Sequence, residues 1–180
     1  MVTWAMLQFR RATAADILLL RELAADIWRR SYREMLAPAQ MDYMLAWMYG
    51  AETIRAEIDA GVWWEVIELE GVAIGYLAAE RGAEVKLHKL YLRPEQQGRG
   101  FAQQALAHVE EVVRAWGAER MVLNVNKRNA RAIRAYERAG FVVVDAVVND
   151  IGGGFVMDDF IMARAVAPPT DAQTSTPLAG

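Results

Sequence analysis

The stretch from Lys89 to Ala102 constrains the fold more than any other part of this sequence. It reads Lys-Leu-Tyr-Leu-Arg-Pro-Glu-Gln-Gln-Gly-Arg-Gly-Phe-Ala, which predicts a buried strand, a short loop with two glycines and the first turn of a long helix. The first turn of a helix leaves backbone N–H groups without partners, and the helix dipole adds partial positive charge there. The stretch therefore predicts a phosphate site between a strand and a helix.

The remaining hydrophobic pattern predicts one α+β domain in which helices flank a central mixed sheet of about seven strands. The expected order is strand, three helices, three strands, helix, strand, helix and two strands. The expected strands cover residues 6–11, 62–69, 72–79, 84–92, 121–126, 141–148 and 155–162. The expected helices cover residues 17–28, 38–49, 51–59, 101–116 and 129–138.

Composition limits the functional classes that are open to this chain. Its 180 residues carry a net charge of −3, whereas a general nucleic-acid binder usually has a basic excess, so we expect no nucleic-acid partner. The absence of Cys excludes disulfides, thiolate catalysis and Cys-based zinc sites. With only two histidines, His88 and His108, we do not expect a bound metal.

The two ends of the sequence bear on location and domain boundaries. No basic region followed by an apolar run is seen at the start, and no apolar run approaches the roughly 20 residues of a membrane helix. We therefore expect a cytoplasmic protein with no membrane partner. The end is rich in Pro, Thr and Ser and cannot bury much apolar surface. We expect a single domain over residues 1–164 and a disordered tail over residues 165–180.

The Gly-Arg-Gly sequence at 98–100 fits neither of two common nucleotide motifs. A Walker loop needs Lys followed by Ser or Thr after the last glycine, but Phe-Ala follows here. A dinucleotide fingerprint needs Gly or Ala where Gln103 stands. Two interpretations remain: a helix start with two turn glycines, or a pyrophosphate cradle of the form Gln-x-x-Gly-x-Ala, filled by Gln97, Gly100 and Ala102.

A second motif decides between them. Residues 126–141 match Asn-x-x-Asn-x-x-Ala-x-x-x-Tyr-x-x-x-Gly-Phe. With both motifs present in this order and at this separation, the sequence resembles the GCN5-related N-acetyltransferase (GNAT) superfamily over roughly residues 6–162. The resemblance favours the pyrophosphate cradle and implies a GNAT-like acyltransferase fold. Residues 150–159 show a weaker similarity to members related to polyamine acetyltransferases.

The resemblance implies that acetyl-CoA lies in a V-shaped cleft between the strands at 84–92 and 121–126. The backbone of Leu90, Tyr91 and Leu92 would pair with the pantetheine arm as an added strand would. Asn129 would contact the cofactor from the other side. The residues expected to hold the pyrophosphate are Gln97, Gly98, Arg99, Gly100, Phe101 and Ala102.

Tyr136 corresponds to the family tyrosine next to the thioester sulfur, where its hydroxyl can donate a hydrogen bond to the developing thiolate. The alternative is a core aromatic residue on a helix face. The attacking amine must lose a proton, and His88 is our candidate base. Glu84 lies four residues earlier and would share the face of His88 on a regular strand. Alternatively, His88 packs against a helix and a water chain removes the proton.

The acceptor site is expected between the first two helices and the last strands. Adjacent strand residues face opposite sides of a sheet, so either Asp158 or Asp159 could point inward and hold an ammonium group. We assign Asp158 to substrate binding, with surface solvation as the alternative. The aromatic candidates, whose spacing also suits a core, are Trp28, Tyr32, Tyr43 and Trp47.

These observations predict an acetyl-CoA-dependent N-acetyltransferase that acts on a primary amine of a small molecule by direct transfer in a ternary complex. Without Cys, an acetyl-cysteine intermediate is impossible. The alternatives are acetylation of a protein N-terminus or lysine, and a non-catalytic CoA-binding regulatory module. Pairing of the last strands between two copies would give a homodimer, but the sequence does not show it.

Overall fold

A seven-stranded sheet organises the protein, with the strand order β1-β2-β3-β4-β5-β7-β6. The computed structural model describes residues 6–168. The strands are β1 (Gln8–Arg11), β2 (Trp63–Leu69), β3 (Val72–Glu80), β4 (Val85–Leu92), β5 (Arg120–Asn126), β6 (Val142–Gly152) and β7 (Phe155–Ala165). All neighbouring strands are antiparallel except the parallel pair β4 and β5. The expected α+β class and mixed sheet are confirmed.

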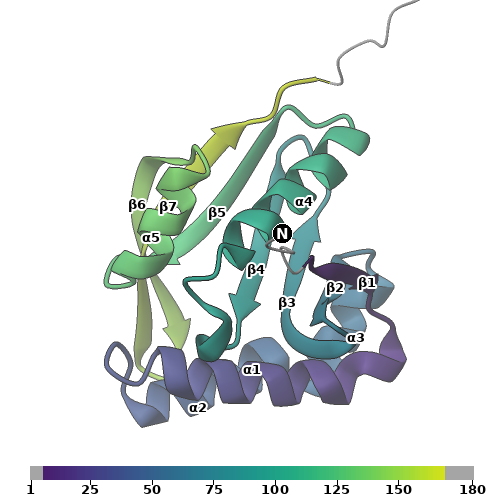
Figure 1. Cartoon of the computed structure of the whole chain (residues 1–180). Helices are drawn as coiled ribbons and strands as arrows, with labels where there is room; N and C mark the ends of the chain where they lie inside the picture. The colour runs from purple at the N-terminus through teal and green to yellow at the C-terminus, as the bar shows by residue number, and fades with distance from the viewer. Residues whose placement is uncertain (1–5, 169–180) are drawn as a thin grey trace, which may run out of the picture.

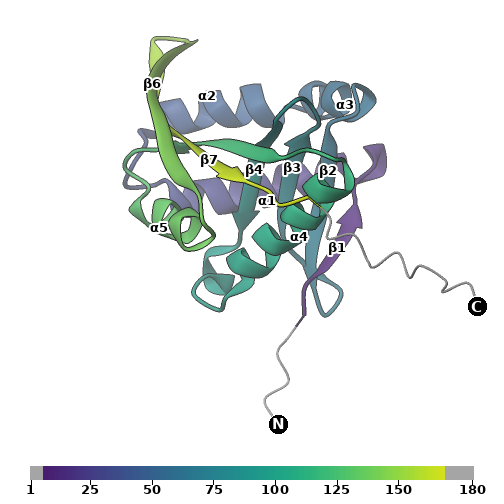
Figure 2. The same cartoon turned by 90° about the horizontal axis from the view of Figure 1, so that it is seen from above.

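Helices cover both faces of this sheet (Figure 1). They are α1 (Ile17–Ser31), α2 (Pro38–Tyr49), α3 (Ala51–Asp59), α4 (Phe101–Ala115) and α5 (Ala130–Arg138), with short 3-10 turns η1 (Ala14–Asp16) and η2 (Pro94–Gln96). Figure 2 shows α2 and α3 on the opposite side of the sheet from α4 and α5. Two apolar cores follow from this layering, one under α4 and α5 and one under α1, α2 and α3.

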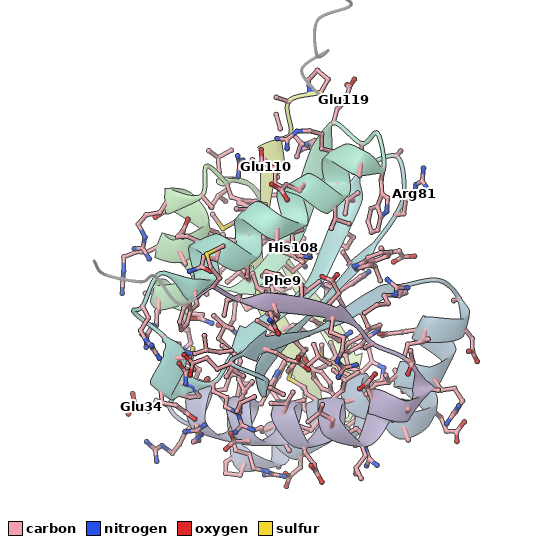
Figure 3. The ribbon with its side chains drawn as sticks, turned by 45° about the vertical axis from the view of Figure 1, so that its right-hand side comes forward. Phe9, Glu34, Arg81, His108, Glu110 and Glu119 are labelled. Atoms are coloured by element: carbon pink, nitrogen blue, oxygen red, sulfur yellow. The ribbon has the colours of Figure 1, made fainter. Side chains whose placement is uncertain are left out.

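The sequence explains the position of α4, which begins directly at the glycine loop. Its buried residues Leu106, Val109 and Val113 recur at three- and four-residue spacing and face the sheet. Toward β1 and β2, the His108 ring of α4 stacks on Phe9 of β1 at a centroid distance of 3.8 Å (Figure 3). His108 Nε2 also lies 2.7 Å from Oε2 of Glu65 on β2. These contacts fix α4, and with it the glycine loop, to the sheet.

The parallel strands β4 and β5 pair over only a short stretch, which leaves part of the edge of β4 open to a ligand. Residues 85–87 of β4 pair with residues 121–123 of β5, and beyond them the two strands diverge (Figure 1). On its other edge β4 stays close to β3, where a β-carbon on Gly75 would lie only 2.2 Å from the carbonyl oxygen of Tyr91. Glycine at this position therefore lets β4 lie against β3 while it separates from β5.

A β-bulge in β4 occurs at the point of divergence. Ala78 of β3 pairs with Lys89, but the next residue, Ala79, pairs with Leu87, so His88 is the extra residue. A bulge interrupts the alternation of side chains along a strand. Leu87 is accordingly buried in the core under α4, whereas Lys89 is buried against the Tyr49 and Trp64 rings of the other core.

The structure changes the expected boundaries at the C-terminal end. Strand β7 continues to Ala165, and the buried Val166 donates its N–H to the carbonyl oxygen of Glu119. The domain therefore extends beyond residue 164, and the rest of the predicted tail, from residue 169, lies outside the described residues, as do residues 1–5. Within residues 6–168, no helix has the length and apolarity required to cross a membrane.

Candidate functional site

The divergence of β4 and β5 leaves one edge of β4 open beside residues 90–92. On the other edge, Leu90, Tyr91 and Leu92 pair with β3. Within residues 6–168, no strand pairs with the edge that faces β5 beyond Leu87. An extended chain that carries amide groups can bind to such an edge as an additional strand.

The glycine loop leads from this edge to the start of α4. Gly98 and Gly100 have φ angles of +77° and +80°, which glycine adopts without strain. Gly100 is the N-cap residue and has no side chain to cap the helix, so the N–H groups of the first turn remain available to a ligand. Gln97 Nε2 donates to the carbonyl oxygen of Leu92 at 3.3 Å and closes the loop. This geometry fits a phosphate group.

Arg99 is directed along the loop. Its Nη1 donates to Oε1 of Gln96 at 2.6 Å, and its guanidinium lies 4.8 Å from the centroid of the Phe101 ring. The side chain therefore adds positive charge next to the cradle without occupying it.

Tyr136 belongs to α5, which lies on the α4 side of the gap between β4 and β5. Its ring packs in the core under α4, at a centroid distance of 5.7 Å from Phe141. Yet its phenol interacts electrostatically with Tyr32 and Tyr91, which belong to the core on the other face. Burial raises the pKa of the Tyr136 phenol, so the hydroxyl stays protonated and available as a donor.

Three other predicted residues surround this gap. Asn129 Oδ1 accepts a hydrogen bond from the N–H of Ala132 at 3.1 Å and so caps α5. Tyr32 is buried and interacts with the side chains of Tyr91 and Asn129, and its burial raises the pKa of its phenol. Trp28 is only 2 % exposed and donates from Nε1 to the Tyr49 hydroxyl at 3.2 Å. Trp28 is therefore a core residue, and its assignment to substrate binding is wrong.

A cleft of about 560 Å³ lies on the α2 side of the diverging strands, and we call it the acceptor cleft. Its apolar walls come from α2 and from the hairpin of β6 and β7. Tyr43 of α2 holds this hairpin by donating from its hydroxyl to the carbonyl oxygen of Ile151 at 2.7 Å. The apolar lining residues are Trp47, Met48, Leu87, Ile151 and Met157, and the polar ones are Lys86, His88, Asn124, Asn149, Asp150 and Asp159.

The carboxylate that points into the acceptor cleft is Asp159. It is 1 % exposed, and its Oδ1 has no hydrogen-bond partner among the described residues. Burial raises the pKa of this carboxyl, while the Asn124 side chain and the charge of Lys86 act in the opposite direction. Asp158, which we expected at this position, is 54 % exposed and forms an ion pair with Lys127. The expectation that Asp158 faces the cleft is therefore wrong, and the carboxylate that lines the cleft is Asp159.

His88 lines the acceptor cleft, but its carboxylate partner is not the expected one. His88 Nε2 lies 2.7 Å from Oε2 of Glu80, at the end of β3. Glu84 lies just before β4 and forms an ion pair with Arg120, at the end of the sheet where β4 and β5 still pair. The expectation that Glu84 acts together with His88 is wrong, because the bulge interrupts the regular strand that it assumed.

Among residues 6–168, no group of three or more acidic or histidine side chains is arranged to hold a metal ion. The described residues form an open strand edge, an anion cradle, a protonated phenol and a cleft lined by a carboxylate with one oxygen, Oδ1 of Asp159, that has no hydrogen-bond partner. These features suit the transfer of a group from an extended, phosphate-bearing donor to a cationic or hydrogen-bonding acceptor.

Comparisons with known proteins agree with this arrangement. An uncharacterized N-acetyltransferase of Mycobacterium tuberculosis is 35 % identical over 97 residues, which are 53 % of this chain and 62 % of that protein. The chain thus matches less than two-thirds of the length of its curated relatives. The PaiA N-acetyltransferase of Thermoplasma acidophilum, solved with coenzyme A, superposes with a TM-score of 0.76 at 21 % identity over 88 % of this chain and 98 % of that one.

A spermidine N-acetyltransferase of Vibrio cholerae, solved with CoA and spermine, has a TM-score of 0.67 at 21 % identity over 89 % of this chain and 96 % of that one. These identities are low, so the two structures establish the fold alone. The model of the acetyltransferase (GNAT) family matches residues 21–141, which is more than half of the chain. The protein therefore belongs to the acetyltransferase (GNAT) family.

Proposed function

We propose that this protein transfers the acetyl group of acetyl-CoA to a primary amine of a small molecule, directly and within a ternary complex. The observation that carries the proposal is the buried Oδ1 of Asp159, which has no partner and lines the acceptor cleft. A buried carboxylate oxygen without a partner is costly, and an ammonium or amine N–H would satisfy it. Tyr32 interacts electrostatically with both Tyr136 and Asp159.

The donor site follows from the open edge of β4. In this proposal the backbone of residues 90–92 pairs with the pantetheine arm, and the first-turn N–H groups at 97–102 hold the pyrophosphate. Asn129 uses its oxygen to cap α5 and interacts with Tyr32, and its amide group has two N–H donors, so one of them can donate to the cofactor. Acetyl-CoA supplies the acyl carbon as a thioester.

In the chemical step, Asp159, His88 and Tyr136 each have one role. The amine nitrogen attacks the thioester carbonyl carbon while Asp159 holds its N–H, and the C–N bond forms. His88 takes a proton from this nitrogen as a general base, oriented by Glu80. The C–S bond then breaks, and the Tyr136 hydroxyl donates a hydrogen bond to the leaving thiolate. The proton that His88 took from the amine passes through water to this thiolate, so the products are the N-acetylated amine and the free thiol of CoA, and His88 returns to its neutral form.

We expect His88→Gln to lower kcat/KM by about 100-fold, because general-base catalysis typically contributes at least that much. The limb of the pH–rate profile that reports the ionisation of the base should disappear in this variant. Glu80→Gln should change the same limb more weakly. His108→Gln should leave the shape of the pH–rate profile unaltered, since His108 lies on the other face of the sheet beside Phe9, although its contacts with the sheet help to position α4. An unaltered pH–rate profile in His88→Gln would exclude His88 as the base.

A free-thiol release assay over a panel of amines tests the function itself. The panel contains monoamines, a linear polyamine, amino-acid amides, peptides with a free N-terminus and peptides with an internal lysine. We expect turnover with small amines. Release with peptides alone would instead support the protein acetyltransferase alternative. Tight CoA binding without release from any amine would indicate a regulatory module.

A further inference from the structure

The acceptor cleft contains a positive charge that the proposed reaction does not use. Lys86 of β4 is half-buried and lines this cleft, two residues before His88. Its Nζ donates a hydrogen bond to Oδ1 of Asn124 on β5. Among residues 6–168, its ammonium forms no ion pair within 4.0 Å. An ammonium has three N–H donors, so donors of Lys86 remain for a ligand.

The acidic side chains around Lys86 are engaged elsewhere or lie too far away to neutralise it. Glu80, its neighbour across β3 and β4, lies 2.7 Å from His88. Asp150 accepts a backbone N–H of its own hairpin at 2.9 Å. Asp159 attracts the charge of Lys86, but not as an ion pair within 4.0 Å. Burial lowers the pKa of the Lys86 ammonium, as it does for a partly desolvated cation, so an anionic ligand would be bound favourably here.

Asn124 lies between Lys86 and Asp159 and separates the two charges. Its Oδ1 accepts from Lys86, so its amide nitrogen is the group that donates to the carboxyl of Asp159. All three side chains line the acceptor cleft. One end of this polar row is therefore an ammonium with donors to spare, and the other end is a carboxylate with an oxygen, Oδ1, that has no partner.

We propose that the acceptor substrate carries a carboxylate as well as its amine, and that Lys86 binds the carboxylate. The inference rests on the proposed acetyltransferase function and narrows its substrate to amino acids with a short carbon chain between the two groups. Asp159 holds the amine, Lys86 holds the carboxylate, and the apolar walls from α2 and the β6–β7 hairpin enclose the carbon chain. A linear polyamine would instead place a second ammonium beside Lys86, and like charges repel.

Matched pairs of acceptors test this proposal in the free-thiol release assay. The pairs are 3-aminopropanoate with propylamine, 4-aminobutanoate with butylamine, and 5-aminopentanoate with pentylamine. Both members of a pair have the same reacting amine and differ only in a terminal carboxylate or methyl group. In at least one pair, we expect kcat/KM to be about tenfold higher for the carboxylate, as one charge-assisted hydrogen bond provides. The diamine 1,4-diaminobutane should be a poorer acceptor than 4-aminobutanoate.

Substitution of Lys86 distinguishes recognition of the carboxylate from a structural role. Lys86→Met keeps an apolar stem without the charge, so the two members of the preferred pair should then differ by no more than about twofold in kcat/KM. A structural role alone would lower both values alike and leave their ratio unchanged. Lys86→Arg keeps the charge and should retain part of the preference. Lys127→Met is the matched control, because Lys127 pairs with the exposed Asp158 and does not line the cleft.

The results separate this inference from the function on which it rests. Equal kcat/KM values within every pair, or an unchanged ratio in Lys86→Met, would overturn the proposal even though the protein acetylates amines. Faster turnover of 1,4-diaminobutane than of 4-aminobutanoate would also overturn it and would indicate a polyamine acceptor. Absence of thiol release with every acceptor, including those of the wider amine panel, would instead overturn the proposed function itself.

Discussion

Replacing Tyr136 with Phe is expected to lower kcat by about 100-fold and to leave the Kd of acetyl-CoA within about twofold of its original value. The hydroxyl interacts with the leaving sulfur only as negative charge develops on it, so its loss raises the barrier without weakening the ground-state complex. Burial raises the pKa of this phenol, which keeps the donor proton in place across the neutral range. Kinetics of a single turnover, where chemistry limits the rate, provide the measurement.

Tyr43→Phe is a matched control for this experiment, because it removes a phenol oxygen of the same kind from α2. That hydroxyl is bonded to the carbonyl oxygen of Ile151, in the wall of the acceptor cleft rather than in the gap. Tyr43→Phe should therefore affect the KM of the amine more than kcat. If Tyr136→Phe retained the original single-turnover rate, Tyr136 would have no part in the reaction and would be only a core residue beside Phe141.

The fold could be predicted from the sequence because each element carries its own local signal. The spacing of Leu106, Val109 and Val113 shows the buried face of α4, and the glycines at 98 and 100 mark its start. The order of the elements then leaves few arrangements for one sheet. The two motifs at 97–102 and 126–141 also predicted where the glycine loop and Tyr136 lie, since both depend on short stretches of sequence.

The acceptor side of the site could not be predicted in the same way, because it depends on register and on contacts between distant strands. The bulge at His88 arises from the pairing of β3 with β4, and no local pattern indicates it. Glu80 becomes the partner of His88 only through the same hairpin. Because side chains alternate along a strand, the sequence predicts that either Asp158 or Asp159 faces the cleft. The register in which Asp159 of β7 pairs with Asn126 of β5 decides which of the two does.

The surroundings of Trp28 and Arg131 could not be predicted from the sequence for a similar reason. The spacing of apolar residues around Trp28 is the same whether that side of the helix packs in a core or lines a cleft. In the structure, Trp28 packs in the core against Tyr49. Arg131 stands inside the second motif, yet its position opposite Gly98 depends on how α5 packs beside the loop. The concentration of positive charge between α1 and α5 therefore cannot be predicted from the sequence alone, because it depends on how the two helices lie in the folded protein.

Asp159→Asn is expected to make the protein more stable and to weaken its binding of the amine, because the negative charge of Asp159 is costly in the folded protein but is needed to hold the substrate. The buried carboxylate lacks a partner for Oδ1, and the amide of Asn keeps an oxygen for Asn124 without a charge. We expect the free energy of unfolding to rise by about 1 kcal/mol at pH 7, since removal of a poorly compensated buried charge is stabilising. The KM of the amine should rise by about 30-fold, the value of a hydrogen bond to a charged group.

The pH dependence of this stability difference follows from the raised pKa of Asp159. Well below the pKa of an unfolded Asp, about 3.9, the carboxyl is protonated in both states and the wild-type protein and the Asn variant should be equally stable. As the pH rises, the unfolded chain ionises first, so the wild-type protein loses stability relative to the variant until the folded carboxyl ionises as well. Urea unfolding from pH 3 to pH 8 measures this difference.

Asp158→Asn provides the control for both effects, because Asp158 is the neighbouring carboxylate on the opposite face. It is 54 % exposed and forms a surface ion pair with Lys127, so its loss should change the free energy of unfolding by less than about 1 kcal/mol and leave the KM unaltered. If Asp159→Asn destabilised the protein at neutral pH, the carboxylate would have a partner that stabilises it. If the KM of the amine stayed the same, Asp159 would not bind the acceptor, and the acceptor cleft would recognise its amine through other side chains.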